Sequence, residues 1–355
     1  MCRMIPPESK ANSLENRKTM TSRSIKVSCL VITWAIIGIF PRMARSQEPA
    51  RIRYGVTTSV AHLPVLVARD AGLFSKYGLD VEVIHIRGGA LITMTIMSGS
   101  VQFSGAGAES VVGARIEGGD VTLLACPADT DVVYFVARPE IKSAAALKGK
   151  ASAVTRLGST THFYLRTALK HLGLDPEKDM TILQLGAAGE IFAAMLSGRV
   201  AGATLPFRNA FPLLQMGWPV LADLSSSDFP YPSSCVATSR AFIKNNPILV
   251  DRFLRAYVEA IRLIKRDNAP TERVLRKWYK DTDPLLIKRT IEIYSRLFNP
   301  IPYVPDKGIE VVLKEVALRR PVPKEFLGNP DLFRDHAPLE KLVKEGWVDR
   351  LYKSF

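Results

Sequence analysis

Apolar and polar positions along the chain predict strands and helices in alternation. Ile52, Tyr54 and Val56 recur at a spacing of two, so residues 51–56 are predicted to form a strand. A loop of small polar residues, 57–61, then leads into an apolar run of helical length. Helix N-termini and free backbone N–H groups meet at the carboxyl ends of strands in open α/β sheets, so this loop is a candidate ligand site.

The same order of elements continues as far as residue 125. Further strands are predicted at 81–86, 101–104 and 121–125, with helices between them at 91–97 and 111–117. Each helical crossover brings the next strand back in the same direction. The βαβαβαβ order therefore predicts a parallel sheet.

A second copy of this pattern begins near Lys150. It predicts a strand, a small-polar loop, a helix, a strand and a further helix, at 151–155, 157–161, 163–172, 181–185 and up to Met195. Two short motifs recur in nearly constant register, Gly-Leu-Asp at 78–80 and 173–175, and Ser-Gly-x-Val at 98–101 and 197–200. We therefore predict an α/β protein with two similar lobes.

Extended apolar runs at 131–138 and 233–239 are predicted to connect these lobes as a hinge. Amphipathic helices follow at 249–265, 271–279 and 284–298, and a Pro-rich stretch leads to a last helical region ending near Tyr352. The predicted domains are a leader, a first lobe with the C-terminal helices and a second lobe, at 1–46, 47–130 with 236–355, and 131–235.

The leader has the pattern of an export signal. Basic residues precede an apolar run at 27–40, Pro41 ends it, and Ala44 and Ser46 supply the small residues of a signal peptidase site. The run is shorter than the roughly 20 residues of a membrane-spanning helix. We predict cleavage near Ser46 and a periplasmic mature chain; an uncleaved membrane anchor is the alternative. Translation could start at Met1 or Met20.

Charge and composition narrow the possible partners. Of the formal charge of +14, removal of the leader leaves +8, from 40 basic and 32 acidic residues. The basic residues of the C-terminal helices alternate with apolar ones, and aromatic residues do not interleave with them as in a nucleic-acid-binding stripe. With 47% hydrophobic and 23% charged residues, we predict a globular protein with no nucleic-acid partner.

Two cysteines, Cys126 and Cys235, remain outside the leader. They could pair in an oxidising compartment, but the sequence does not fix their distance, so a disulfide stays open. Neither lies near a histidine at ligand spacing. We predict no metal site and no cofactor.

Several motifs carry a family resemblance. They are His62-x-Pro64, Gly72-Leu73-Phe74, Tyr77-Gly78-Leu79-Asp80-Val81, Gly88-Gly89, Met97-Ser98-Gly99-Ser100-Val101 and Gly105-Ala106-Gly107. Over about 51–263 the chain resembles the nitrate, sulfonate, taurine and thiamine-precursor solute-binding family of ABC importers. The resemblance implies a type II periplasmic-binding fold, with two βα lobes joined by a two-strand hinge. It also implies a monomeric extracytoplasmic receptor that works with an ABC permease and its ATPase.

The resemblance also implies which residues bind the small-molecule ligand. Carried onto this chain, they are Thr57, Thr58, Ser59, His62, Gly88, Gly89, Gly107, Ala108, Glu109, Gly158, Ser159, Thr160 and Thr161. Phe207 and Arg208 are added as candidates, Arg208 as a partner for a carboxylate or sulfonate. Structural roles are the alternative to ligand contact for several of these residues. The hydroxyls could cap helices, Glu109 could stabilise a helix dipole and Arg208 could connect the two lobes.

The sequence departs from the family where members often carry an acidic residue, since residues 200–204 read Val-Ala-Gly-Ala-Thr. Ligand identity is therefore open among sulfonates, nitrate, aromatic acids and pyrimidines.

Enzymes and regulators share this fold. Thiamine-pyrimidine synthases carry clustered cysteines and a desulfinase has a cysteine in the first-strand loop, where this chain reads Thr-Thr-Ser-Val-Ala at 57–61. A regulator would need a helix-turn-helix module where the leader stands. We predict a receptor and no enzyme, with a synthase-like or desulfinase-like enzyme as the alternative.

Overall fold

The computed structural model describes residues 48–225 and 230–353. The predicted leader and its cleavage site lie outside these residues. Within them, no helix combines the length and the apolar character that crossing a bilayer requires.

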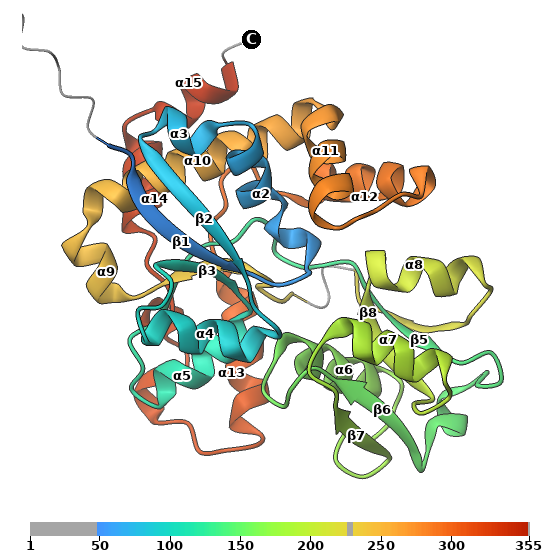
Figure 1. Ribbon diagram of the computed structural model, residues 1–355. Helices are drawn as coiled ribbons and strands as arrows, with labels where there is room; N and C mark the ends of the chain where they lie inside the picture. Colours follow the sequence, from blue (N-terminus) through green and yellow to red (C-terminus); the bar gives the residue numbers. More distant parts are fainter. Residues whose placement is uncertain (1–47, 226–229, 354–355) are drawn as a thin grey trace, which may run out of the picture. The chain divides into compact units, whose positions relative to one another are not determined.

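The first lobe is built on a five-stranded sheet (Figure 1). Its order is β2 (Leu79–His85), β1 (Ala50–Val56), β3 (Phe103–Ala106), β10 (Cys235–Thr238) and β4 (Thr122–Ala125). β1 pairs in parallel with β2 and β3, as predicted, but β10 lies antiparallel between β3 and β4. The four strands predicted between 51 and 125 run parallel to one another, but the complete sheet is mixed and not parallel throughout, because local alternation cannot reveal a strand inserted from more than a hundred residues away.

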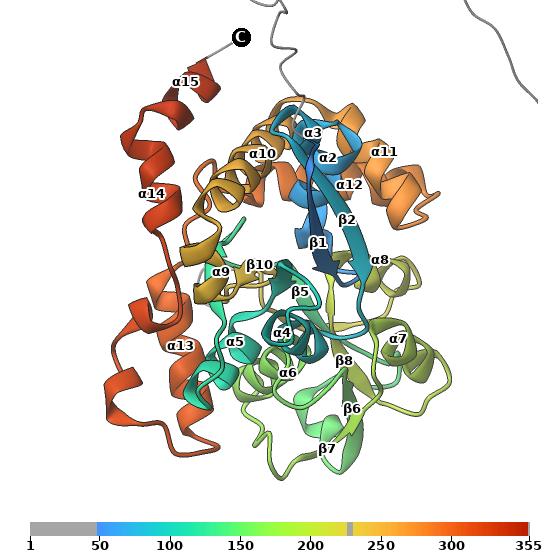
Figure 2. The ribbon, with the colours of Figure 1, turned by 60° about the vertical axis from the view of Figure 1, so that its left-hand side comes forward.

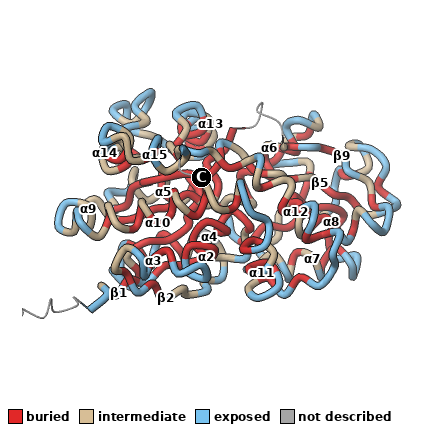
Figure 3. The backbone as a smooth tube through the Cα atoms, turned by 90° about the horizontal axis from the view of Figure 1, so that it is seen from above, coloured by how far each residue is buried: buried red, intermediate tan, exposed pale blue. Residues whose placement is uncertain are grey.

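Helices cover both faces of this sheet. α2 (Leu63–Asp70), the short α3 (Leu73–Lys76) and α10 (Pro247–Arg266) share one core with it, and α4 (Gly89–Met97) and α5 (Ala108–Ile116) share the other. Side chains alternate between these cores, so Leu124 joins the first and Leu123 the second. The buried backbone runs through the middle of the molecule and the exposed segments surround it (Figure 3).

An aromatic stack fixes α10 on the sheet. Phe253 of α10 is fully buried, and its ring centroid lies 5.8 Å from that of Tyr54 and 4.2 Å from that of Phe103. Burying such a side chain contributes about 2–3 kcal/mol. The predicted amphipathic helix at 249–265 is thus confirmed, with its apolar face against the strand that precedes the candidate ligand loop.

The second lobe contains two small sheets. One has the order β8 (Gly202–Pro206), β5 (Val133–Ala137) and β9 (Val220–Asp223), and the other pairs β6 (Lys150–Val154) with β7 (Met180–Gln184) in parallel. Its helices are α6 (Thr160–His171), α7 (Ala188–Leu196) and α8 (Phe207–Gln215). β6, its loop and α6 repeat the order of β1, its loop and α2, so two similar βα lobes are confirmed.

The chain crosses between the lobes just before β5 and just before β10. β5 belongs to a sheet of the second lobe and β10 to the sheet of the first lobe, so most of each predicted extended run lies inside a lobe. The segments that connect the lobes are therefore shorter than the predicted runs. A disulfide joins Cys126 to Cys235, and the Tyr231 N–H donates to the Asp129 carbonyl at 3.0 Å. The disulfide and this hydrogen bond therefore hold the two crossing segments together. The exact lobe boundaries stay a prediction.

The C-terminal helices bridge the lobes. They follow α9 (Arg240–Asn245) and α10 as α11 (Asn268–Trp278), α12 (Pro284–Leu297), α13 (Asp306–Ala317), α14 (Ala337–Lys344) and α15 (Trp347–Lys353). Leu286 of α12 packs on Phe207 and Phe211 of α8. α13 lies along α5 (Figure 2), and its Glu315 pairs with Lys170 of α6.

We expect removal of the disulfide to destabilise the protein. It closes a loop spanning 109 residues, so the variant Cys126→Ala with Cys235→Ala should lower the free energy of unfolding by about 3–5 kcal/mol. Urea denaturation of the oxidised wild type and of the double variant measures this difference. The reduced wild type serves as control and should match the variant; a wild type that reductant leaves unchanged would contradict the prediction.

Candidate ligand-binding pocket

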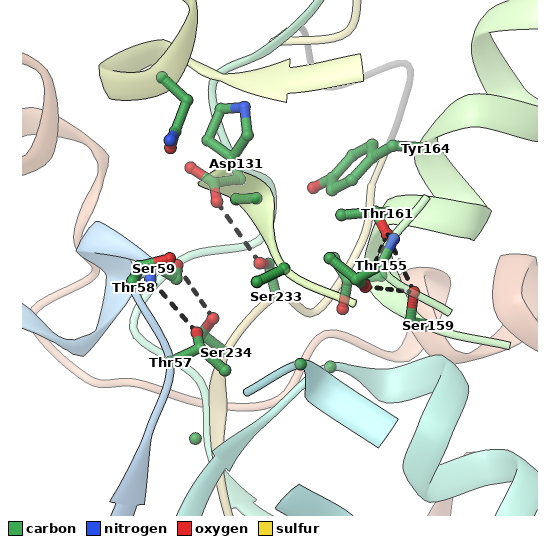
Figure 4. Close-up of a pocket in the computed structure, with 18 of the residues that line it drawn as sticks. Thr57, Thr58, Ser59, Asp131, Thr155, Ser159, Thr161, Tyr164, Ser233 and Ser234 are labelled. Atoms are coloured by element: carbon green, nitrogen blue, oxygen red, sulfur yellow. Dashed lines mark hydrogen bonds between the residues drawn. The ribbon is translucent and has the colours of Figure 1, made fainter. Parts of the chain in front are cut away.

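A pocket lies where the loops of the two lobes meet (Figure 4). Its cavity measures about 150 Å³, well above the roughly 10–15 Å³ that one water needs. Residues from the ends of β1, β2, β3, β6 and β8, from the start of α7 and from both crossing segments line it. Both lobes therefore contribute to one site of small-molecule size.

Hydroxyl groups dominate the polar lining. They belong to Thr57, Thr58, Ser59, Thr155, Ser159, Thr160, Thr161, Tyr164, Thr204, Ser233 and Ser234. Each hydroxyl can donate and accept hydrogen bonds, so this lining can bind polar ligands that are donors as well as polar ligands that are acceptors.

The first of these loops is held from behind by a buried histidine. The Thr57 N–H donates to His62 Nε2 at 3.0 Å, which requires an unprotonated nitrogen there. Burial lowers the pKa of His62 to about 3, so the ring stays neutral at ordinary pH. A Cβ on Gly105 would lie 1.9 Å from His62 Cε1, so only glycine fits beside this ring. His62 shapes the loop that lines the pocket.

The corresponding loop of the second lobe is arranged in the same way. Its Gly158 N–H donates to His162 Nδ1 at 3.0 Å, and the pKa of His162 is lowered to about 4, chiefly by burial. The hydroxyls of Thr155, Ser159 and Thr161 lie within 2.9–3.1 Å of one another. This hydroxyl cluster stands at the start of α6, whose first N–H groups have no side-chain cap.

Two charged side chains line the pocket in contrasting settings. Asp131 is buried, and it accepts hydrogen bonds from the Tyr294 hydroxyl at 2.8 Å and the Val132 N–H at 2.9 Å. Burial raises its pKa to about 6. Arg87 is exposed and forms an ion pair across the pocket with Glu190 of α7. Such an exposed pair adds about 0–1 kcal/mol to the contact between the lobes.

The structure places eight of the fifteen predicted site residues in the lining. These are Thr57, Thr58, Ser59, Gly88, Gly107, Ser159, Thr160 and Thr161. Six others lie outside it, namely His62, Ala108, Glu109, Gly158, Phe207 and Arg208, and the position of Gly89 relative to the pocket stays a prediction. For all fifteen, contact with a ligand stays a prediction.

Two charged candidates are engaged elsewhere. Arg208 donates from Nη2 to Asp281 Oδ1 at 2.6 Å and to the Tyr279 carbonyl at 2.6 Å, so it joins α8 to the segment after α11. Glu109 pairs with Arg319, and burial raises the Glu109 pKa while the arginine opposes that shift. Both partners are far away in sequence, which is why the sequence could not show that these charges are already paired.

Sequence reasoning missed several lining residues. They include His85, Ile86, Arg87, Asp131, Val133, Thr155, Tyr164, Ala187, Ala188, Gly189, Thr204, Pro206, Ser233 and Ser234. Asp131, Ser233 and Ser234 stand at the starts of the two runs predicted to form the hinge. Segments that connect two lobes form the base of the space between the lobes. The predicted hinge could therefore have identified these three residues as part of the lining.

Fold and pocket together define the type II periplasmic-binding architecture. More specifically, residues 59–269 match the family model described as NMT1/THI5 like, and the chain belongs to this family. No curated protein sequence matches the chain.

Solved structures agree on the fold. The alkanesulfonate-binding protein SsuA from Xanthomonas axonopodis pv. citri, bound to MOPS, is 22% identical with a TM-score of 0.67, covering 80% of this chain and 98% of its own. The periplasmic nitrate-binding protein NrtA from Synechocystis PCC 6803 is 14% identical with a TM-score of 0.73, covering 86% and 92%. A DszB mutant in complex with biphenyl-2-sulfinic acid is 15% identical with a TM-score of 0.61, covering 84% and 99%. The predicted fold class is confirmed.

The neutral histidine behind the first loop predicts acid sensitivity. In the unfolded chain this imidazole takes up a proton near pH 6.5, but folded His62 does so only near pH 3. The unfolded state therefore binds more protons between these values, and stability falls as the pH falls through this window. His62→Gln keeps an acceptor for the Thr57 N–H and removes this titration.

Between pH 6.5 and 4.5 the wild type should lose about 2 kcal/mol more unfolding free energy than His62→Gln. Urea denaturation at each pH measures this. His162 is present in both proteins and cancels in the difference. Parallel stability curves would show that His62 does not titrate as its burial requires.

Proposed function

We propose that this protein is the extracytoplasmic solute-binding receptor of an ABC importer, and that it captures a small polar or anionic organic molecule. The observation that carries this proposal is that one pocket is lined by matching loops of both lobes. A ligand that contacts both loops binds best when the lobes are together, so it favours the closed arrangement by its differential affinity.

The relatives support the same role. SsuA is an alkanesulfonate-binding protein and NrtA a nitrate-binding protein. By this proposal the mature chain is periplasmic after removal of the leader, acts as a monomer and delivers its ligand to a membrane permease served by an ATPase.

A receptor is favoured over an enzyme by the chemistry of the lining. A desulfinase-like mechanism needs a cysteine in the loop after β1, and that loop begins Thr57, Thr58 and Ser59. Both cysteines of the described residues are joined in the disulfide. The hydroxyl-rich lining can bind a polar molecule, and it offers no thiol nucleophile to attack one.

The variant Gly189→Phe tests whether this pocket is the binding site. Gly189 lines the pocket, and a Cβ placed on it meets no atom within 4 Å, so the backbone tolerates a side chain there. A benzyl group fills much of a cavity of about 150 Å³. We expect affinity for any compound that binds the wild type to fall at least tenfold.

The measurement is isothermal titration, after a thermal-shift screen of the wild type with sulfonates, nitrate, aromatic acids and pyrimidines. Gly189→Ala is the matched control and should bind within about threefold of the wild type. Equal affinity of the wild type and Gly189→Phe would place binding elsewhere. Turnover of a bound compound, seen as a new product by mass spectrometry, would favour the enzyme.

A further inference from the structure

Asp131 is the buried charge of the pocket, and its carboxylate is only partly used by the protein. Oδ1 accepts the hydrogen bonds from the Tyr294 hydroxyl and the Val132 N–H. Oδ2 accepts one long bond, from the Ser233 hydroxyl at 3.4 Å. An ionised carboxylate has about four acceptor positions. At least one position on Oδ2 is therefore left for a donor in the pocket.

No cation of the described residues neutralises this carboxylate. Its partners are two hydroxyls and one backbone N–H. Arg87, which also lines the pocket, is paired with Glu190, and Arg208 is paired with Asp281. Burying an ionised carboxylate without a compensating cation costs free energy, and the raised pKa of Asp131 reflects that cost. A ligand that brings a donor or a positive charge would lower it.

The other side of the pocket has the opposite character. Figure 4 shows the Asp131 carboxylate on one side and Thr155 and Ser159 on the other. The N-termini of α4, α6 and α7 reach the lining through Gly88, Thr160 and Ala188, and none of these helices has a side-chain cap. Uncapped N–H groups and the helix dipole favour an acceptor or an anion there.

We propose that the ligand is a molecule with two unlike ends, an anionic or acceptor group at the N-termini of α4, α6 and α7 and an N–H or O–H donor at Asp131. This inference rests on the proposed receptor function and names its ligand class, amino- or hydroxyl-bearing organic acids. A compound with acidic groups at both ends is rejected, because it sets an anion against the Asp131 carboxylate. A compound lacking the donor leaves that carboxylate unpaired.

A structural role for Asp131 makes a different prediction. Its bond from Tyr294 ties the crossing segment to α12, and Tyr294 does not line the pocket. Tyr294→Phe removes this tie and leaves the carboxylate in place. If Asp131 only supports the hinge, Asp131→Asn and Tyr294→Phe should change ligand preference alike. If it receives the ligand donor, only Asp131→Asn should change the preference.

The experiment is isothermal titration of the purified protein with matched probes. One set is taurine, ethanesulfonate and sulfoacetate, and the other is 4-aminobenzoate, benzoate and terephthalate. Within each set the members share an anionic head and differ in whether the other end is a donor, is absent or is a second acid. In at least one set the wild type should bind the donor member at least tenfold more tightly than the other two.

Asp131→Asn should reduce this preference below about threefold and improve binding of the doubly acidic member, while Tyr294→Phe should keep the preference. Equal binding of the three members by the wild type overturns the inference without needing any variant. A preference that survives in Asp131→Asn, or that is lost in Tyr294→Phe, also overturns it. In these cases binding itself still supports a receptor. A failure of all six probes to bind also overturns the inference, whereas the receptor is contradicted only if the wider screen, with nitrate and pyrimidines, finds no ligand either.

Discussion

The pocket depends on one interaction that occurs once in each lobe, a backbone N–H donated to a neutral, buried histidine. His62 accepts from Thr57 and His162 accepts from Gly158. Burial lowers both pKa values, so each ring keeps an unprotonated nitrogen at neutral pH. Because these histidines hold the loop backbone from behind, the loops keep the shape in which their residues line the cavity. A histidine that charged on acidification would lose its acceptor and release the loop.

The second constraint is the way the C-terminal helices tie the lobes together. Arg208 of the second lobe binds Asp281 and the Tyr279 carbonyl, and the Tyr279 hydroxyl donates to the Ser59 carbonyl at 2.7 Å. This chain of bonds links α8 to the first pocket loop. Breaking a buried ion pair leaves one charge unsatisfied, which costs about 3–5 kcal/mol. The position of the second lobe and the shape of the loop are therefore coupled through the segment between α11 and α12.

The chemistry of the pocket follows from which charges are already paired. Arginines near it are engaged with Glu190 and Asp281, whereas the Asp131 carboxylate has hydroxyl and N–H partners only, as far as residues 48–225 and 230–353 are concerned. A pocket of this kind does not favour a simple anion at every point. Its uncapped helix N-termini attract negative charge on one side, and Asp131 attracts donors on the other. The electrostatic contrast between these sides, more than the pocket's size, is the basis for the proposed ligand class.

The sequence by itself determined the local order of the chain. Period-two and helical patterns identified β1, β2, the repeat at β6 and α6, and the long helix α10, because these depend on neighbouring residues. The family motifs led to the pocket loops at 57–59 and 159–161. Only the tertiary structure placed β10 inside the first sheet, joined Cys126 to Cys235 and turned Arg208 toward Asp281. Each of these is a contact between distant segments, and no local pattern encodes which distant partner a strand, thiol or charge will meet.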